Sequence, residues 1–196
     1  MSQQNISNKK HQIKCVAREL FTRWGYKKTT LDDIAHRCQF AKPTIYYYYE
    51  NKEAIFNEVV LEEAQFFINR VMKRVSSDLP VDERIIQFAH MTYTDMKSFT
   101  REILDAPKTL DEFSLHGQPV IYKIRELFRN HLRSFLQTGL RDGSLNYDDE
   151  EITLQTLACI ADFVRIDWMR RIPENLRDRI IDTMLQIVLY GLKRRA

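Results

Sequence analysis

The chain has few of the residues that interrupt helices. Its 196 residues include five glycines and five prolines, and no glycine- or proline-rich linker divides it. Long runs instead carry apolar residues three and four positions apart, a spacing typical of helices that bury one face. With 44% hydrophobic residues, the chain is long enough to bury a substantial core. These features exclude a mainly disordered chain and predict an all-α fold.

Cysteine pairs, metal-binding motifs and long apolar runs are also lacking. The three cysteines are widely spaced within helical apolar patterns, as expected of reduced core residues. No signal peptide opens the chain, and no apolar run approaches the ~20 residues that cross a bilayer, so we expect a cytoplasmic protein without a membrane segment. The five histidines are isolated, and no P-loop, dinucleotide fingerprint, H-E-x-x-H or C-x-x-C motif is present. We therefore expect no metal, no cofactor and no enzymatic activity.

Charge is unevenly distributed along the chain. The overall net charge is +3, but residues 1–56 alone carry +5 and the remainder carries −2. A basic first quarter on a mildly acidic body is typical of a protein that meets phosphate groups at one end. A lysine-rich N-terminus is also often a solvated tail, so charge supports this interpretation only together with a binding motif.

Two short helices are predicted between residues 30 and 49. Thr30 is a candidate N-cap for the first, and Asp32 and Asp33 follow in the first turn, where the helix dipole favours acids. The buried face of this helix is predicted to consist of Leu31, Ile34, Ala35 and Cys38. Pro43 then suits the first turn of a second helix, because its missing N–H would have no intrahelical partner there.

The rotation of the second helix follows from its spacing. If Ile45 points into the core, a step of about 100° per residue places Pro43 and Tyr47 opposite it and Thr44 and Tyr46 on the flanks. The four tyrosines could instead pack a core, but Tyr46 and Tyr47 cannot both face inward together with Ile45. A hydroxylated and aromatic outer face is suited to a DNA major groove, where hydroxyls bond base edges and apolar surface contacts thymine methyls.

The segment K-P-T-I-Y-Y-Y-Y-E-N-K-E-A-I-F, preceded by T-L-D-D-I-A, resembles the helix-turn-helix signature of the tetracycline-repressor (TetR) family of bacterial transcription regulators. The resemblance covers about residues 6–56, and the rest of the chain agrees in helical pattern. It implies a three-helix DNA-binding head on a larger helical body, about nine helices in all. The DNA contacts that it implies are Thr30 and Lys52 on phosphates, with Lys42, Pro43, Thr44, Tyr46, Tyr47 and Tyr48 in or beside the major groove.

One departure from the family pattern lies between the two short helices. Where the family usually has Ala-Gly-Val, this chain has Cys38-Gln39-Phe40. Gln39 must then adopt a conformation that glycine adopts at less cost. Lys42 and Pro43 also replace smaller residues that are commoner in the family, so no known operator sequence is transferred to this chain.

Helix ends divide the chain into a predicted head and body. The first helix is expected from Asn8 to Trp24, ended by Gly25, and Asn51 is a candidate N-cap for a long fourth helix. The amide of Lys52, together with the helix dipole and the lysine ammonium, is suited to a DNA phosphate. We place the helix-turn-helix domain at residues 1–52 and the ligand-binding and dimerisation domain at residues 53–196.

The body contains aromatic and methionine side chains at helical spacing. Such a set is more often core than ligand wall, although adaptable apolar sites are lined in the same way. The candidate pocket residues are Phe88, Met91, Tyr93, Met96, Phe99, Phe113, His116, Tyr122, Phe128 and Trp168. They favour a small apolar or amphipathic effector.

The last helix has an apolar stripe too wide for a helix with one solvated face. A buried helix within one chain explains this almost as well as a partner does. The family resemblance implies a homodimer in which two such helices from each subunit form a four-helix interface, with recognition helices one DNA turn apart. The candidate interface residues are Ile160, Val164, Ile181, Met184, Leu185, Val188 and Leu192.

These patterns favour a homodimeric regulator that binds a double-stranded DNA operator, a repressor released by an effector in the helical body. The alternative is an all-helical carrier of small molecules without operator binding. The basic head and the exposed face predicted around Thr44 and Tyr47 favour the regulator.

Overall fold

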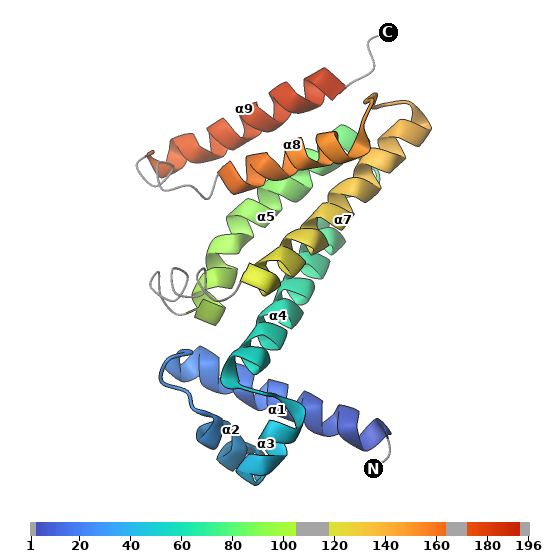
Figure 1. Cartoon of the computed structure of the whole chain (residues 1–196). Helices are drawn as coiled ribbons and strands as arrows, with labels where there is room; N and C mark the ends of the chain where they lie inside the picture. Colours follow the sequence, from blue (N-terminus) through green and yellow to red (C-terminus); the bar gives the residue numbers. More distant parts are fainter. Residues whose placement is uncertain (1–2, 105–117, 164–171, 193–196) are drawn as a thin grey trace. The chain divides into compact units, whose positions relative to one another are not determined.

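The computed structural model describes residues 3–104, 118–163 and 172–192, and all regular structure in these ranges is helical (Figure 1). This confirms the all-α prediction. The helices are α1 (Gln3–Trp24), α2 (Leu31–Cys38), α3 (Lys42–Tyr48), α4 (Lys52–Arg74), α5 (Val81–Leu104), α7 (Gln118–Asp142), α8 (Glu150–Phe163) and α9 (Glu174–Leu192).

The chain forms two compact units. The first comprises Met1–Phe67 and Lys97–Ile124, and the second comprises Ile68–Met96 and Arg125–Ala196. Helix α4 belongs to the first unit up to Phe67 and then continues into the second. The boundary predicted at residues 52 and 53 stays a prediction.

Helix α1 begins earlier than the sequence indicated, at Gln3 instead of Asn8, and ends at Trp24 as predicted. Gly25 follows with a φ of 82°, a left-handed conformation that favours glycine. Its amide donates a 2.9 Å hydrogen bond to the carbonyl of Phe21 and so closes the last turn.

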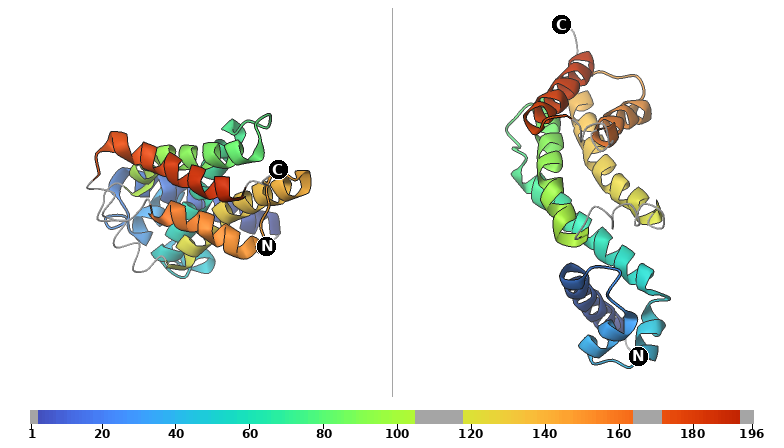
Figure 2. Two further views of the ribbon diagram at one scale, coloured as in Figure 1. Left: turned by 90° about the horizontal axis from the view of Figure 1, so that it is seen from above. Right: turned by 90° about the vertical axis from the view of Figure 1, so that its left-hand side faces the viewer.

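The core of the head is built where α1, α2 and α3 meet the first half of α4 (Figure 2). The ring of Phe21 meets the ring of Phe56 edge-on at 5.1 Å, and Tyr26 lies 4.5 Å from Phe56. Burying such rings contributes strongly to core stability. The fully buried aliphatic side chains of this core are Ile13, Ala17, Ile34, Ile45 and Ile55.

Helix α4 begins at Lys52 because Asn51 caps it. The Asn51 side-chain oxygen accepts a 2.8 Å hydrogen bond from the amide of Ala54, which confirms the predicted cap. The apolar side of the helix is buried, at Ile55, Phe56, Val59, Phe67 and Val71.

Three ion pairs join α4 to α1 within the head. Lys10 contacts Glu58 at 2.5 Å, Lys14 contacts Glu62 at 3.2 Å and Arg18 contacts Glu63 at 2.7 Å. The three cations follow one another at intervals of four residues and therefore lie along one face of α1. The first half of α4 is thus fixed to α1 by polar contacts as well as by the core.

In the second unit, Phe88 of α5 is buried against α7. Its ring centroid lies 6.4 Å from that of Phe128 and 5.7 Å from that of Phe135. Gly139 is helical, and α7 ends at Asp142 before Gly143, whose φ is 76°. A Cβ atom at Gly139 would lie 2.5 Å from Cγ of Leu145, so this glycine allows a close approach between segments.

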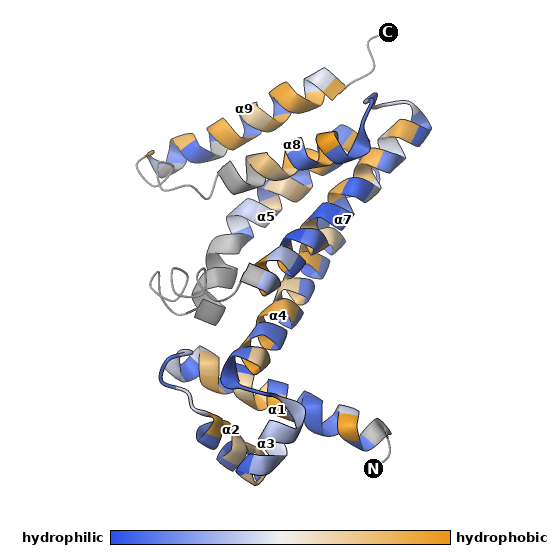
Figure 3. Cartoon of the chain, viewed as in Figure 1, coloured by the Kyte–Doolittle hydropathy of each residue, from blue (hydrophilic) through white to orange (hydrophobic). Residues whose placement is uncertain are grey.

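The last two described helices, α8 and α9, start at Glu150 and Glu174. Asp149 caps α8, since its side chain accepts a 2.9 Å hydrogen bond from the amide of Ile152. Figure 3 shows hydrophobic residues along much of α9. Within the described ranges, no helix has the length and apolar character that crossing a membrane requires.

Candidate nucleic-acid interface

Helix α2 starts at a reciprocal cap. The hydroxyl oxygen of Thr30 accepts a 3.1 Å hydrogen bond from the amide of Asp33, and the Asp33 carboxylate accepts one of 2.8 Å from the amide of Thr30. The hydrogen bond that the Thr30 hydroxyl donates to this carboxylate also lowers the pKa of Asp33. The predicted cap is confirmed, and the Thr30 hydroxyl is already bonded within the head.

The connection from α2 to α3 keeps its geometry without glycine. Gln39 has φ 58° and ψ 37°, the left-handed conformation expected at this point. The amide of Phe40 donates a 2.9 Å hydrogen bond to the carbonyl of Ala35, and the amide of Gln39 bonds His36 at 3.1 Å. These bonds satisfy carbonyls at the end of α2 and offset the conformational cost at Gln39.

The exposure of the α3 side chains confirms the predicted rotation of this helix. Ile45 is completely buried, whereas Tyr46 is 50% exposed and Tyr47 is 67% exposed. Pro43 and Lys42 are exposed, and Thr44 and Tyr48 are half-buried. The side chains that the sequence placed on the outer face are therefore accessible to a large partner.

The end of α3 is held by a buried tyrosine. Tyr49 is only 4% exposed, and its hydroxyl donates a 3.0 Å hydrogen bond to Oε2 of Glu58 in α4. Burial, supported by the nearby Glu58 charge, raises the pKa of Tyr49 far above its usual value. The carboxylate of Glu58 thus joins α3, through Tyr49, to α1, through Lys10.

The ammonium of Lys52 is bound inside the head. It donates 2.8 Å hydrogen bonds to the carbonyls of Tyr26 and Thr29 and lies 4.3 Å from the ring centroid of Tyr26. Partial burial lowers the pKa of Lys52. The sequence had assigned this ammonium to a DNA phosphate, but here it fixes the segment between α1 and α2. Only the backbone amide of Lys52 keeps the predicted position at the start of α4.

Lys42 has a partner that the sequence did not indicate. Its ammonium contacts Oδ2 of Asp32 in the first turn of α2 at 2.8 Å, and this hydrogen bond raises the pKa of Lys42. The sequence had given Asp32 only a role at the helix dipole. Sequence spacing alone carries no signal for the pair, because the turn at Gln39 determines which side chains of the two helices meet.

The described members of the predicted pocket are divided between core and surface. Phe88 is buried beside Phe128, Met91 and Tyr93 are half-buried, and Tyr122 is 65% exposed. The side chains of Met96 and Phe99 and the whole of Phe113, His116 and Trp168 lie outside the described residues.

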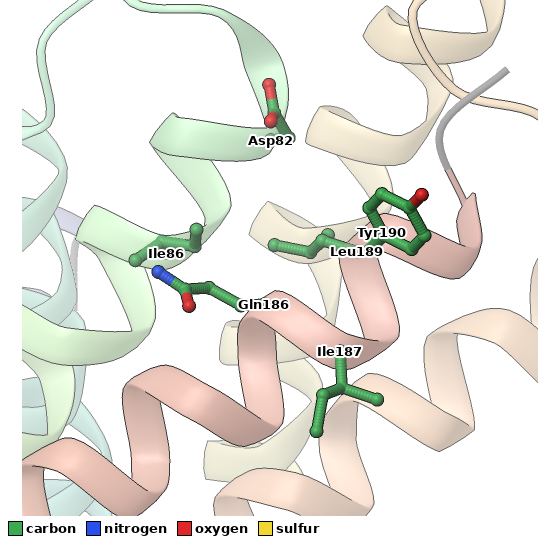
Figure 4. A pocket seen from close by; sticks show the side chains of 6 residues that line it. All are labelled: Asp82, Ile86, Gln186, Ile187, Leu189 and Tyr190. Atoms are coloured by element: carbon green, nitrogen blue, oxygen red, sulfur yellow. The ribbon is translucent and has the colours of Figure 1, made fainter. Parts of the chain in front are cut away.

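A groove of about 560 Å³ lies between α5 and α9 in the second unit (Figure 4). Asp82 and Ile86 line it from α5, and Gln186, Ile187, Leu189 and Tyr190 line it from α9. A second hollow of about 530 Å³ shares Ile86 and Gln186 with it, and also includes Glu83, His90, Met91 and Asp182. Of the predicted pocket residues whose side chains the structure describes, only Met91 lines either hollow. The linings of both hollows combine apolar side chains, such as Ile86, with acidic ones, such as Asp82 in the first and Asp182 in the second.

The predicted interface residues of α9 face different surroundings. Ile181 and Leu185 are 2% and 3% exposed within the single chain, so they pack its core and leave no surface for a partner, which corrects their assignment. Met184, Val188 and Leu192 are half-buried, whereas Ile187 and Tyr190 are 68% and 72% exposed. The side chain of Ile160 and the whole of Val164 lie outside the described residues.

No group of three or more histidine, cysteine or acidic side chains suited to a metal ion occurs in the part of the chain that the structure describes. The acidic side chains of the head instead take part in ion pairs, such as Glu58 with Lys10, and in helix caps, such as Asp33 with Thr30.

The sequence of this chain is similar to those of bacterial transcription regulators. Residues 15–59 match the sequence model of bacterial regulatory proteins of the tetR family. The HTH-type transcriptional regulator YhgD of Bacillus subtilis is 24% identical over 94% of this chain and 97% of its own length. The negative transcriptional regulator IcaR of the biofilm operon icaADBC of Staphylococcus epidermidis is 35% identical, over 32% of this chain and 34% of its own length.

A solved structure shares the fold along nearly the whole chain. The transcriptional regulator FadR from Bacillus subtilis, solved in complex with stearoyl-CoA, superposes with a TM-score of 0.62 at 19% identity. The match covers 93% of this chain and 98% of that one.

The contacts of Lys52 predict that this residue stabilises the head. Lys52→Met removes the donor for two backbone carbonyls, which should lower the free energy of unfolding by about 1–3 kcal/mol in urea denaturation. The matched control is Lys42→Met, since Lys42 is exposed and its ion pair is solvated. An equal or larger loss for Lys42→Met would contradict the structural role of Lys52.

Proposed function

The chain belongs to the tetR family of bacterial regulatory proteins and is a helix-turn-helix transcription regulator, and from this premise we propose that it is a homodimeric repressor released by a small effector. The observation that carries the proposal is the outer face of α3. A short helix that buries Ile45 and exposes Tyr46 and Tyr47 has the form of a recognition helix.

The proposed contacts with DNA divide into two kinds. Lys42, Thr44, Tyr46 and Tyr47 read base edges in the major groove, and Pro43 adds apolar surface beside them. The amide of Lys52 at the start of α4 and the hydroxyl of Tyr48 contact phosphates and fix the position of the head. Thr30 would join them by exchanging the hydrogen bond of its hydroxyl to Asp33 for one to a phosphate. The positive charge of residues 1–56 adds attraction that does not depend on sequence.

Repression is favoured over activation by the relatives. IcaR, which matches 32% of this chain, is named a negative regulator of its operon. A dimer that covers an operator represses by occupying DNA that the transcription machinery needs.

The proposed dimer uses the exposed side of α9. Ile187 and Tyr190 are large apolar residues that remain exposed in the single chain, and Ile152 of α8 is 67% exposed. Ile187 and Tyr190 also line the groove between α5 and α9, so the proposed dimer surface adjoins that groove. Exposed apolar side chains on neighbouring helices are typical of a surface that a partner covers. Met184 and Val188 supply half-buried surface on the same helix.

The proposed effector is a neutral amphipathic molecule bound between α5 and α9. The apolar lining at Ile86 and Leu189 is suited to an alkyl chain, and Gln186 to a polar head. FadR was solved with stearoyl-CoA, but Asp82, Glu83 and Asp182 beside this groove would repel the phosphates of a CoA group. We expect the body to have two conformations, one of which holds the heads in the arrangement that binds DNA. An effector that binds the other conformation more tightly lowers the affinity for DNA, and the size of this effect is limited by the ratio of its affinities for the two conformations.

Site-specific DNA binding is the first expected outcome. The purified protein should bind the DNA upstream of its own reading frame more tightly than random DNA over a range of salt concentrations. Tyr47→Ala should change the base preference at one or two positions by about 1–3 kcal/mol, as measured with single-base substitutions. Phe66→Ala is the matched control, because Phe66 is 58% exposed on α4 outside the proposed interface. A folded wild type with no preference over random DNA would refute the DNA-binding claim.

Dimerisation through α9 makes a second expectation. Ile187→Asp places a charge on the proposed interface and should shift the protein from dimer to monomer in sedimentation velocity. Leu140→Asp is the control, since Leu140 is 48% exposed on α7 in the same unit. A wild-type monomer, or an unchanged dimer in Ile187→Asp, would rule out this interface.

Effector release can be tested with two ligands of similar chain length. A monoacylglycerol should weaken operator binding by about 5–150-fold, the usual range of allosteric coupling, whereas stearoyl-CoA should have much less effect. Ile86→Glu should abolish the response and leave DNA binding in the absence of ligand unchanged, because Ile86 lines both hollows and lies outside the head. Release by stearoyl-CoA alone, or an undiminished response in Ile86→Glu, would overturn the assignment of the groove.

A further inference from the structure

An acidic side chain lies within the surface proposed to meet DNA. Asp32 stands in the first turn of α2, and its carboxylate contacts the ammonium of Lys42 in the first turn of α3 at 2.8 Å. Both side chains are largely exposed, at 65% for Asp32 and 49% for Lys42. A carboxylate at this place repels DNA phosphates and so weakens binding. Its presence in a DNA-binding surface therefore calls for a favourable effect that is larger than this repulsion.

Capping does not explain the presence of Asp32. The neighbouring carboxylate of Asp33 accepts the hydrogen bonds from Thr30 that complete the cap of α2. A second acid in this turn adds only a small, solvent-screened interaction with the helix dipole. The Asp32 carboxylate instead accepts a hydrogen bond from Lys42, a residue of the proposed recognition helix.

The chemistry of the pair is suited to reading a guanine. A lysine ammonium has three N–H donors, and one bond to Asp32 leaves two for the O6 and N7 acceptors of guanine in the major groove. Lysine has a flexible four-carbon stem. A carboxylate that already holds its ammonium in place reduces the conformational entropy that the side chain loses when it binds DNA. The same carboxylate neutralises a charge that would otherwise attract any phosphate.

We propose that Asp32 is a specificity-determining residue that positions Lys42 toward a guanine edge and suppresses its binding to phosphates. This inference rests on the proposed function, since it concerns the same DNA interface. Asp32 acts through Lys42 and itself needs no contact with a base.

The first test compares wild type with Asp32→Asn on the preferred site and on random DNA. The variant should bind random DNA more tightly, and the ratio of specific to random affinity should fall by about tenfold, on the scale of one base contact. Glu19→Gln is the matched control, because Glu19 is an exposed acid in a 2.9 Å ion pair between α1 and Arg37 of α2. It makes the same change in net charge, and its ratio should stay close to that of wild type.

The second test separates positioning from simple repulsion. In a Lys42→Met background, Asp32→Asn should no longer change the ratio, and both single variants should relax preference at the same base pair. Asp32→Glu, which keeps the carboxylate, should recover most of the discrimination. An equal effect of Asp32→Asn with and without Lys42 would overturn the inference.

The outcome also distinguishes this inference from the proposed function. If wild type shows no site preference, the proposed function fails and the inference fails with it. If wild type discriminates and Asp32→Asn discriminates equally well, only the role of Asp32 is refuted.

Discussion

Burial of Ile45 is the constraint on which the proposed DNA surface depends. Helix α3 has seven residues, and Ile45 is its one completely buried side chain. Because successive residues are rotated by about 100°, fixing Ile45 in the core also fixes which side chains face outward. The exposure of Tyr47 is therefore a consequence of the core, and the turn at Gln39 then brings Lys42 beside Asp32.

The rest of the head serves to hold that short helix in place. Tyr49 ties its end to Glu58, Lys52 holds the carbonyls of Tyr26 and Thr29, and ion pairs join α1 to α4. An isolated helix of seven residues would be marginal in water, so these tertiary contacts supply its stability. The first half of α4, which belongs to the first unit, is bonded to the rest of the head at several points.

The sequence predicted those features that depend on local spacing. The caps at Thr30 and Asn51 and the rotation of α3 each depend on residues within about four positions of one another, and all are confirmed. The left-handed Gln39, expected from the family resemblance, is confirmed as well. The inward turn of the Lys52 ammonium was missed, because its acceptors lie 23 and 26 residues away in the chain.

Tertiary packing also decided the surfaces of the body. The periodicity of α9 indicates a wide apolar stripe, but it does not show which part of the stripe faces the chain's own core and which faces a partner. Ile181 and Leu185 were therefore assigned to an interface, although they pack the core of their own chain. The groove between α5 and α9 brings together residues about 100 positions apart, so no local pattern could indicate it. The resemblance to a known family predicted the architecture, and the side-chain contacts came from the three-dimensional structure.

Selection of binding sites from a random DNA library tests the central claim most directly. A dimer with two heads should enrich an inverted repeat whose half-site centres lie about one helical turn, or 10–10.5 base pairs, apart. Tyr47→Ala should enrich a different half-site with the same spacing. Recovery of DNA without any common sequence by the folded wild type would contradict the account.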